Sequence, residues 1–547
     1  MSQRGSTAKS RYDKYEPIRF SFLTRARQCS ELTIPTLIPP QAHSASTIYY
    51  TPWQGIGARG VNNLAAKLLL SLLPPNSPFF RLVVDEFTMD KISPDPSKRS
   101  VVDEGLAKIE RSVQSEIEGS GLRSPIFEAL KHLIVGGNVL IYLPPDGGIR
   151  VFPLDSYVCK RDPYGNVLEL ITREKVSLTA LDPEVYNWLD AGETESKGED
   201  EDEGSEKDAE EDMEEIVEVY TRMWRYGDMH HVCQEINGKT VPGSEGKYPK
   251  DKSPFIPLRW TRIDNEDYGR GYVEEYLGDL ISLEGLSKSI VQASAAASKI
   301  VFLTNPNGVT RAKDIASAES GDFKVGVATD VTVLQAEKFA DMRIAFESIK
   351  TISERLSYAF LMNTSIQRQA ERVTAEEIRF MAGELEDALG GVYSILSQEF
   401  QFPLVNRVMD RMTKAKKLPA LPKGVVTPAI VTGVEALGRG HDLNKFNALM
   451  QALAPLGPQV IAQYMNPGDY INRVGTSLGI DMMGLVKSPE QIAQEQQQQA
   501  QQAQQQQMMD LAGKAVPGAV KGIADGSLQA GQMAQEQAQQ DQGPPSQ

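Results

Sequence analysis

Two short groups of residues have the types and spacing to carry chemistry, and the first is a glycine pattern. Gly55, Gly57 and Gly60 match the G-x-G-x-x-G sequence that turns tightly beneath a dinucleotide pyrophosphate. Such a site needs a strand before the pattern and an acid about twenty residues after it. Residues 49–53 are turn-like, however, and the later stretch reads Leu-Leu-Pro-Pro-Asn-Ser-Pro. Close packing at a helix start therefore explains these glycines better than nucleotide binding, which stays as the rival enzyme hypothesis.

The second group, His230, His231 and Cys233, offers metal-binding side chains. No second ligand pair follows at the spacing of a zinc site, and strand alternation would split neighbouring side chains between two faces. The sequence also lacks a P-loop and a nucleophile elbow. We therefore expect no enzyme activity, no cofactor and no metal. The remaining histidines stand alone in the sequence: His43, His132 and His441.

The elements around these groups must come from a long chain with ample apolar content. With 547 residues, 41% of them hydrophobic, several domains or one elaborated domain are expected. Three widely spaced cysteines suit a reducing compartment. The N-terminus does not resemble a signal peptide. The longest apolar run, residues 64–73, contains a lysine and is shorter than the ~20 residues that a bilayer requires. We therefore expect no membrane association.

The net charge of −16 is concentrated in one segment. Residues 193–215 hold fourteen acids and two bases, which gives −12 locally and leaves about −4 for the rest of the chain. The segment has no apolar periodicity, so we expect a disordered acidic insertion over residues 190–215, with a specific electrostatic role as the alternative. The nearly neutral remainder could line DNA if its basic residues gather on one surface.

The first ~270 residues read as a mixture of helices and strands. Apolar periodicity predicts helices over residues 12–34, 57–73, 100–118 and 124–135. Alternation and turn signals predict strands over 79–84, 139–143, 149–152, 167–172, 216–220 and 232–236.

Two long helices follow, over residues 272–298 and 339–362, and a turn-rich excursion with two short strands separates them. The pair therefore predicts a hairpin with a decorated tip. The first helix ends in Ala293-Ser-Ala-Ala-Ala-Ser298. Small residues would let backbones approach closely in a ring of helices, and high helix propensity explains the same residues equally well.

A capping box of Thr374 and Glu377 starts a further helix toward residue 412. Gly390 and Gly391 interrupt it, as does Pro403, and glycine pairs and proline are known causes of kinks. The glycine pair is our candidate hinge.

Residues 364–373 form a short polar loop between two helices. The loop carries the candidate DNA-facing side chains Gln367, Arg368, Gln369 and Arg372. In the alternative interpretation, Arg372 pairs with Glu376 at the helix start. Two helices joined by a basic loop suit a wall that faces something large and anionic.

Several long runs resemble the head-to-tail connector, or portal, family of short-tailed double-stranded DNA phages. They include Thr51-Pro-Trp-Gln-Gly-Ile-Gly-Ala-Arg-Gly60 and Leu133-Ile-Val-Gly-Gly-Asn-Val-Leu-Ile-Tyr-Leu143. Others are residues 268–279, 371–405 and 433–440. The resemblance covers about residues 10–487 and excludes the acidic insertion and the Gln-rich tail.

The resemblance implies an α+β, mainly helical portal fold with wing, stem, clip and crown parts, assembled as a ring around a central channel. The expected parts are a wing over 1–270, stem helices over 271–300 and 337–363, a clip over 301–336, a channel loop over 364–373, a kinked wing helix over 374–418 and a crown over 419–487. Residues 488–547 are expected to hold a Gln-rich helix, either as a barrel or as low-complexity disorder, and a disordered tail.

The resemblance also implies a function in DNA passage. A ring of usually twelve subunits sits at one capsid vertex of the virion after assembly in the host cytoplasm. It passes double-stranded DNA without sequence preference and contacts the terminase, the tail adaptor, the major capsid protein and the scaffolding protein. We place partner docking at the clip tip, on Arg311, Lys313 and Asp314. The alternative is another structural ring protein of the virion, such as a tail adaptor.

Overall fold

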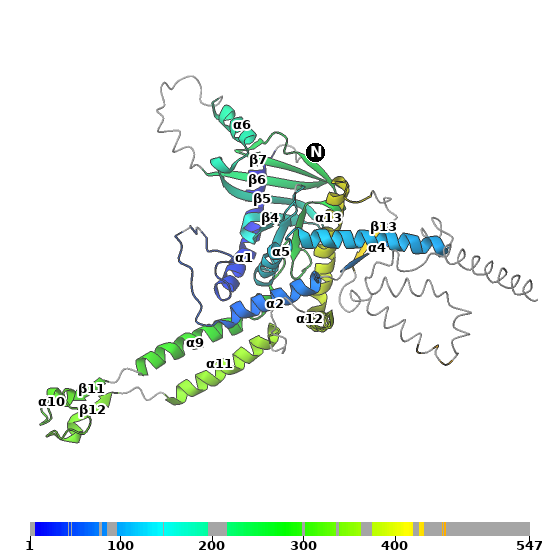
Figure 1. Cartoon of the computed structure of the whole chain (residues 1–547). Coiled ribbons are helices and arrows are strands. Elements are labelled where there is room, and N and C mark those ends of the chain that lie inside the picture. The colour runs from blue at the N-terminus through cyan, green and yellow to red at the C-terminus, as the bar shows by residue number, and fades with distance from the viewer. Residues whose placement is uncertain are drawn as a thin grey trace, which may run out of the picture. The chain divides into compact units, whose positions relative to one another are not determined.

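The computed structural model describes most of the first 430 residues. The described ranges are 6–41, 43–44, 46–75, 79–84, 96–145, 147–194, 216–297, 301–334, 339–362, 375–419 and 426–430, with residues 451, 453 and 455 beyond them. By its internal contacts the chain divides into two units, Met1–Gly438 and Arg439–Gln547. All elements below belong to the first unit, which is mixed helix and sheet (Figure 1).

The largest sheet is antiparallel, in the order β4-β5-β6-β7-β8, and β9 pairs with β7. Its strands are β4 (Tyr157–Arg161), β5 (Val167–Ser177), β6 (Ile216–Tyr226), β7 (Met229–Ile236), β8 (Lys239–Thr240) and β9 (Gly246–Pro249). Helix α6 (Pro183–Thr194) stands in the connection between β5 and β6. The acidic run therefore follows α6 and ends where Ile216 pairs with Ser177.

Helix α1 (Ala8–Glu31) packs on this sheet and is fastened to it by charge. Thr7 caps the helix by accepting the Ser10 N–H at 3.2 Å. Buried Glu169 of β5 accepts from Arg222 Nε at 2.8 Å and from the Tyr15 hydroxyl at 2.9 Å, and it also pairs with Arg11. Two cations and a hydroxyl therefore compensate one buried carboxylate and fix α1 on the sheet.

A second sheet, in the order β10-β2-β3, packs against helix α5 of the main core. Its strands are β2 (Asn138–Tyr142), β3 (Arg150–Phe152) and β10 (Phe255–Arg259). Helix α5 (Arg123–Gly136) enters β2 through Gly137, whose φ is 72°. A Cβ at Gly137 would lie 2.4 Å from the carbonyl carbon of Arg270, so only glycine allows this close approach of two backbones.

The main core is shared by helices that lie far apart in the sequence. Besides α5, it includes α2 (Ile56–Leu72), α4 (Pro96–Gly119), α12 (Ala375–Leu396), a π-helical turn (Ser397–Gln401) and α13 (Phe402–Lys414). Strands β1 (Phe80–Val84) and β13 (Val426–Ile430) pair antiparallel beside α4 and α13. The residues beyond 374 are thus built into the same core as the first 270 residues.

A helical hairpin carries the excursion expected from the sequence. Helix α8 (Tyr272–Glu275) leads into α9 (Leu277–Ala297), and α11 (Phe339–Ala359) returns alongside α9 (Figure 1). Between them lie β11 (Val301–Thr304), α10 (Ala312–Ala316) and β12 (Val331–Leu334), with β11 and β12 paired antiparallel. In the part of the chain that the structure describes, no helix has the length and apolar character to cross a bilayer.

The structure corrects several boundaries predicted from the sequence. Strands β4 and β13 were not expected, and β5 and β6 are each eleven residues long rather than five or six. Residues 190–194, expected within a disordered insertion, end helix α6, and residues 195–215 lie outside the described residues. Most of the crown expected over 419–487 and the whole Gln-rich segment expected over 488–547 also lie outside them.

Burial of His132 in α5 predicts a pH-dependent stability. His132 is 4% exposed, and desolvation lowers its pKa from 6.5 to about 4. The folded protein holds the neutral ring, so the free energy of unfolding falls as pH drops below 6.5, by about 3 kcal/mol at pH 4. Denaturant unfolding at pH 7 and pH 4.5 should show this loss in the wild type and a smaller loss in His132→Leu. Equal losses in both would contradict the assignment.

Candidate functional site

The root of the α9–α11 hairpin is fixed firmly to the body. Phe360, just beyond α11, is fully buried, and its ring packs edge-on against Tyr272 of α8. The Tyr272 hydroxyl donates to the Ala359 carbonyl at 2.7 Å. Between the two long helices, Arg355 of α11 pairs with Asp279 of α9 at 2.6 Å. These contacts fix the direction in which both helices leave the body.

Beyond the root, large apolar side chains point away from the hairpin's own interface. Exposed side chains on α9 are Ile281 (56%) and Val291 (50%), and those on α11 are Ile344 (66%), Phe346 (64%) and Tyr358 (70%). Along α11, Ile349, Ile352 and Leu356 are half-buried or buried, whereas Phe346 is exposed. Both helices therefore carry large apolar side chains that one chain does not cover.

Within the 301–334 excursion, a carboxylate before β12 bonds the backbone of the loop after β11. Asp330 accepts the backbone N–H groups of Val309 at 2.9 Å and Thr310 at 3.1 Å. The predicted docking residues Arg311, Lys313 and Asp314 lie together at the start of α10, and all three are exposed. Phe323 is also fully exposed, a signal that the sequence analysis did not use. The docking role of these residues stays a prediction.

The predicted channel residues Gln367, Arg368, Gln369 and Arg372 lie outside the described residues, but the approach to their loop is described. Leu361 turns the chain with a φ of 53°. Its carbonyl accepts from Asn63 Nδ2 at 3.1 Å and from Lys67 Nζ at 2.8 Å, and Asn63 also donates to Phe360. Helix α2 thus clamps the chain where the loop begins. The sequence analysis missed this clamp, because Lys67 looked like an interruption of an apolar run.

The helix that follows the loop is kinked beside the predicted hinge. Leu389 has φ −128° and ψ 19°, directly before Gly390 and Gly391. Beyond the kink the helix is anchored to α2, because the Tyr393 hydroxyl bonds Ser71 at 2.8 Å and Gln401 donates to the Leu72 carbonyl at 2.7 Å. A Cβ at either glycine would meet nothing within 4 Å. Packing therefore does not require these glycines, and their role as a hinge stays a prediction.

The glycine pattern at the start of α2 serves packing. A Cβ at Gly57 would lie 2.6 Å from the Leu32 carbonyl oxygen, and one at Gly60 would lie 2.5 Å from the Phe360 ring. Gly55, in contrast, has open space around it, and the residues before it are not a strand. Two of the three glycines thus allow α2 to approach α1 and the hairpin root, as the packing interpretation expects.

The histidine pair lies on β7 and is divided between the two faces of the sheet. His231 stacks on Trp224 of β6, with ring centroids 5.6 Å apart. His230 is buried on the other face, where burial lowers its pKa and nearby Arg225 lowers it further. Within the described ranges, no three His, Cys, Asp or Glu side chains gather to hold a metal ion.

Comparison with known proteins points to one family. The family described as bacteriophage head to tail connecting protein matches residues 5–485. The portal protein of Escherichia phage T7 is 42% identical over 89% of both chains, and that of Enterobacteria phage T3 is 43% identical over 88% of this chain and 89% of that one. The neck of an empty gene transfer agent particle aligns with 78% of this chain and 90% of that one at 12% identity, with a TM-score of 0.36, too low to transfer any feature.

Substitution of single glycines separates packing from nucleotide binding. Gly57→Ala should lower the free energy of unfolding by about 1–3 kcal/mol, because a methyl group would overlap the Leu32 carbonyl. Gly55→Ala should change it by less than about 0.5 kcal/mol. Thermal unfolding measures both variants, and a fluorescent nucleotide titration of the wild type should show no binding. Saturable nucleotide binding lost in either variant would contradict this interpretation.

Proposed function

The chain belongs to the bacteriophage head to tail connecting protein family, and on this premise we propose that copies of it form the ring through which a tailed phage packages and ejects its genome. Its function is that of a portal, since relatives covering about nine tenths of the chain are portal proteins. A role as tail adaptor is not favoured. The family relationship gives no support to an enzyme activity.

The exposed apolar side chains of α9 and α11 are the observation that carries the ring. Full burial of a large apolar side chain contributes about 1.5–3 kcal/mol, and these five are 50–70% exposed, so they provide roughly 5–9 kcal/mol if a neighbour covers them. That exceeds the low end of the entropic cost of association, which starts near 4 kcal/mol. A second copy of the chain is the occupant that can supply matching apolar helices.

The exposed apolar side chains belong to two different helices, so one copy can contact two neighbours through them. We propose that α9 of one copy contacts α11 of the next without the reciprocal contact, which makes the interface heterologous. Repeated heterologous contacts close into a ring when the rotation between copies divides a full turn. With twelve copies and one helix each at the lumen, an axis spacing of about 9 Å gives an opening roughly 24 Å across. A duplex passes through such an opening.

The polar loop over 364–373 would present weak contacts to that duplex. Phosphate contacts carry no base information, and salt weakens them, as passage in both directions requires. Arg368 and Arg372, repeated around the ring, would form a basic collar with Gln367 and Gln369 as neutral neighbours. The clamp by Asn63 and Lys67 supports this role, since it fixes one end of the loop.

The remaining contacts follow from the position of such a ring. We assign the exposed tip at Arg311, Lys313 and Asp314 to the terminase during packaging and to the tail adaptor afterwards. The major capsid and scaffolding proteins would contact the body at one vertex of the virion, after assembly in the host cytoplasm. Of the structural parts, α9 and α11 correspond to the proposed stem and residues 301–336 to the proposed clip.

The interface prediction concerns Phe346. Phe346→Arg should reduce ring formation more than tenfold, because each copy would bury an unpaired charge between helices. The variant should unfold within about 0.5 kcal/mol of the wild type under monomeric conditions. Light scattering after size exclusion measures the assembly. Tyr164→Arg, at an 81% exposed aromatic outside the hairpin, is the control and should assemble normally. Unimpaired rings of Phe346→Arg would refute the interface.

The collar prediction concerns the two loop arginines. Arg368→Ala with Arg372→Ala should leave ring assembly intact and reduce DNA retention, with the largest deficit at low salt, because salt screens the phosphate contacts that only the wild type makes. Quantification of packaged DNA per particle at several salt concentrations measures the effect. The matched control is Lys247→Ala with Arg262→Ala, which removes two exposed cations outside the loop. Normal DNA filling at every salt concentration in the loop variant would exclude the collar.

The hinge prediction concerns the glycine pair. Gly390→Ala with Gly391→Ala should straighten α12, since alanine favours helix by about 1 kcal/mol per residue and meets no neighbour. If the kink changes between packaging and ejection, one of the two steps should slow in the variant. Particle yield and single-particle ejection rates measure the two steps. Unchanged values for both would leave the glycines without a mechanical role.

A further inference from the structure

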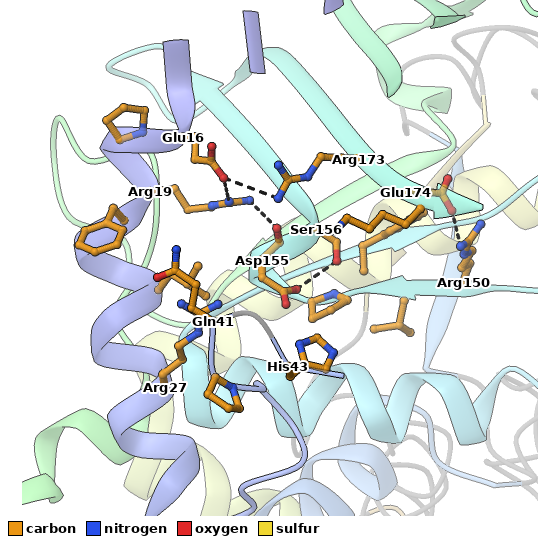
Figure 2. Close-up of a pocket in the computed structure, with 18 residues that line it drawn as sticks. Glu16, Arg19, Arg27, Gln41, His43, Arg150, Asp155, Ser156, Arg173 and Glu174 are labelled. Atoms are coloured by element: carbon orange, nitrogen blue, oxygen red, sulfur yellow. Dashed lines mark hydrogen bonds and ion pairs between the residues drawn. The ribbon is translucent and has the colours of Figure 1, made fainter. Parts of the chain in front are cut away.

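A mixed-charge pocket opens between α1 and the sheets, away from the hairpin. Its volume is about 920 Å3, and its walls come from α1, residues 40–43, β3 with the turn after it, and β5 (Figure 2). Five cationic side chains line it against three acids. The cations are Arg19, Arg27, Arg150, Arg173 and Lys175, and the acids are Glu16, Asp155 and Glu174.

Ion pairing neutralises only part of this charge. Glu16 pairs with Arg19 at 3.0 Å and lies 3.7 Å from Arg173, and Glu174 pairs with Arg150, as Figure 2 shows. Both glutamates are thus engaged by arginines. Asp155 accepts from the neighbouring Ser156 hydroxyl at 3.0 Å and makes no ion pair with a described residue.

Three cationic groups in the pocket keep unused donors. Arg27 donates its Nε to the Pro39 carbonyl at 2.9 Å, and its other nitrogens have no partner among the described residues. Lys175 is exposed and likewise has no ion pair in the described part of the chain. Arg19 is 2% exposed, and its buried Nε finds no hydrogen-bond acceptor. Burial lowers the pKa of Arg27, nearby Asp155 raises it, and nearby Arg19 lowers it. With five cations against three acids, the lining still has a positive balance that an anion would neutralise.

We propose that this pocket is a binding site for carboxylate side chains and that its ligand is the acidic run of the same chain, within residues 195–215. This run lies in the segment with a net charge of −12, the strongest concentration of negative charge in the sequence. Guanidinium groups bind carboxylates through paired, charge-assisted hydrogen bonds, so the free donors of Arg27 suit this ligand.

The path of the chain brings this ligand to the pocket. The acidic run ends where Ile216 pairs with Ser177, and Lys175 precedes Ser177 by two residues, about 7 Å along the strand. Arg27 lies eight residues beyond Arg19 on α1, about 12 Å farther. Twenty-one residues extend to at most about 70 Å, so the run is long enough to reach across the pocket while both of its ends stay attached.

Tethering makes this contact effective although each carboxylate binds weakly. A ligand joined to its site by a short flexible segment acts at a millimolar effective concentration. The occupied pocket would then be inaccessible to other anionic chains, DNA included. The acidic run thereby acquires an electrostatic role beyond solubility, and this role does not depend on ring assembly.

Zero-length carbodiimide cross-linking of the full-length chain tests the proposal, because it joins only carboxylates and amines in direct contact. Arg27→Lys keeps the charge and places an amine at the far end of the pocket. We expect cross-links from position 27 to the acids of residues 199–208 at low salt, at least fivefold more abundant than those from Arg25→Lys. Arg25 lies on the same helix, is 48% exposed and does not line the pocket, so it is the matched control.

Two further measurements make the result decisive. Adding Lys175→Gln to Arg27→Lys should lower the yield at position 27 about threefold, and 0.5 M salt should lower it further, since screening weakens ion contacts. Chains of two isotopic compositions, mixed before assembly, distinguish contacts within one chain from contacts between copies. Equal yields at positions 25 and 27, insensitivity to Lys175→Gln, or a predominance of cross-links between copies would each overturn the proposal.

Discussion

Apolar side chains that one copy of the chain cannot bury are the constraint on which the account depends. Helices α9 and α11 pack against each other and still expose isoleucine, valine, phenylalanine and tyrosine side chains. A folded chain in water tolerates scattered exposed apolar residues, but several large ones on one pair of helices indicate a protein partner. In the ring that we propose, neighbouring copies of the same hairpin would supply that partner.

The rest of the fold fixes the direction of this hairpin and the point where the chain enters the loop after α11. Glycines at the start of α2 let that helix approach both α1 and the hairpin root, where Phe360 is buried. Asn63 and Lys67 then hold the carbonyls at which the loop departs. On the far side of the loop, α12 bends at Leu389 before it is tied to α2 through Tyr393. Helix α2 thus holds the chain just before the segment that we assign to DNA, and it holds α12 again beyond the kink.

Much of this arrangement could be predicted from the sequence, because long amphipathic helices and a glycine–helix junction leave periodic signals. The hairpin, its short antiparallel excursion and the packing role of Gly57 and Gly60 were all expected. Strand β13 was not, because its partner β1 lies more than 340 residues earlier and a local pattern does not report such pairing. The clamp by Lys67 was also missed, since a lysine within an apolar run shows its partner only once the fold places Leu361 beside it.

The central claim is that many copies bury their helical hairpins against one another around an opening. Cryo-electron microscopy of the purified full-length chain tests it most directly, with class averages viewed down the symmetry axis. The account predicts closed rings in which α9 of one copy contacts α11 of the next and residues 364–373 line the opening. A monomer at every protein concentration, or a closed ring whose copies meet through other surfaces while Ile344 and Phe346 stay in solvent, would contradict it.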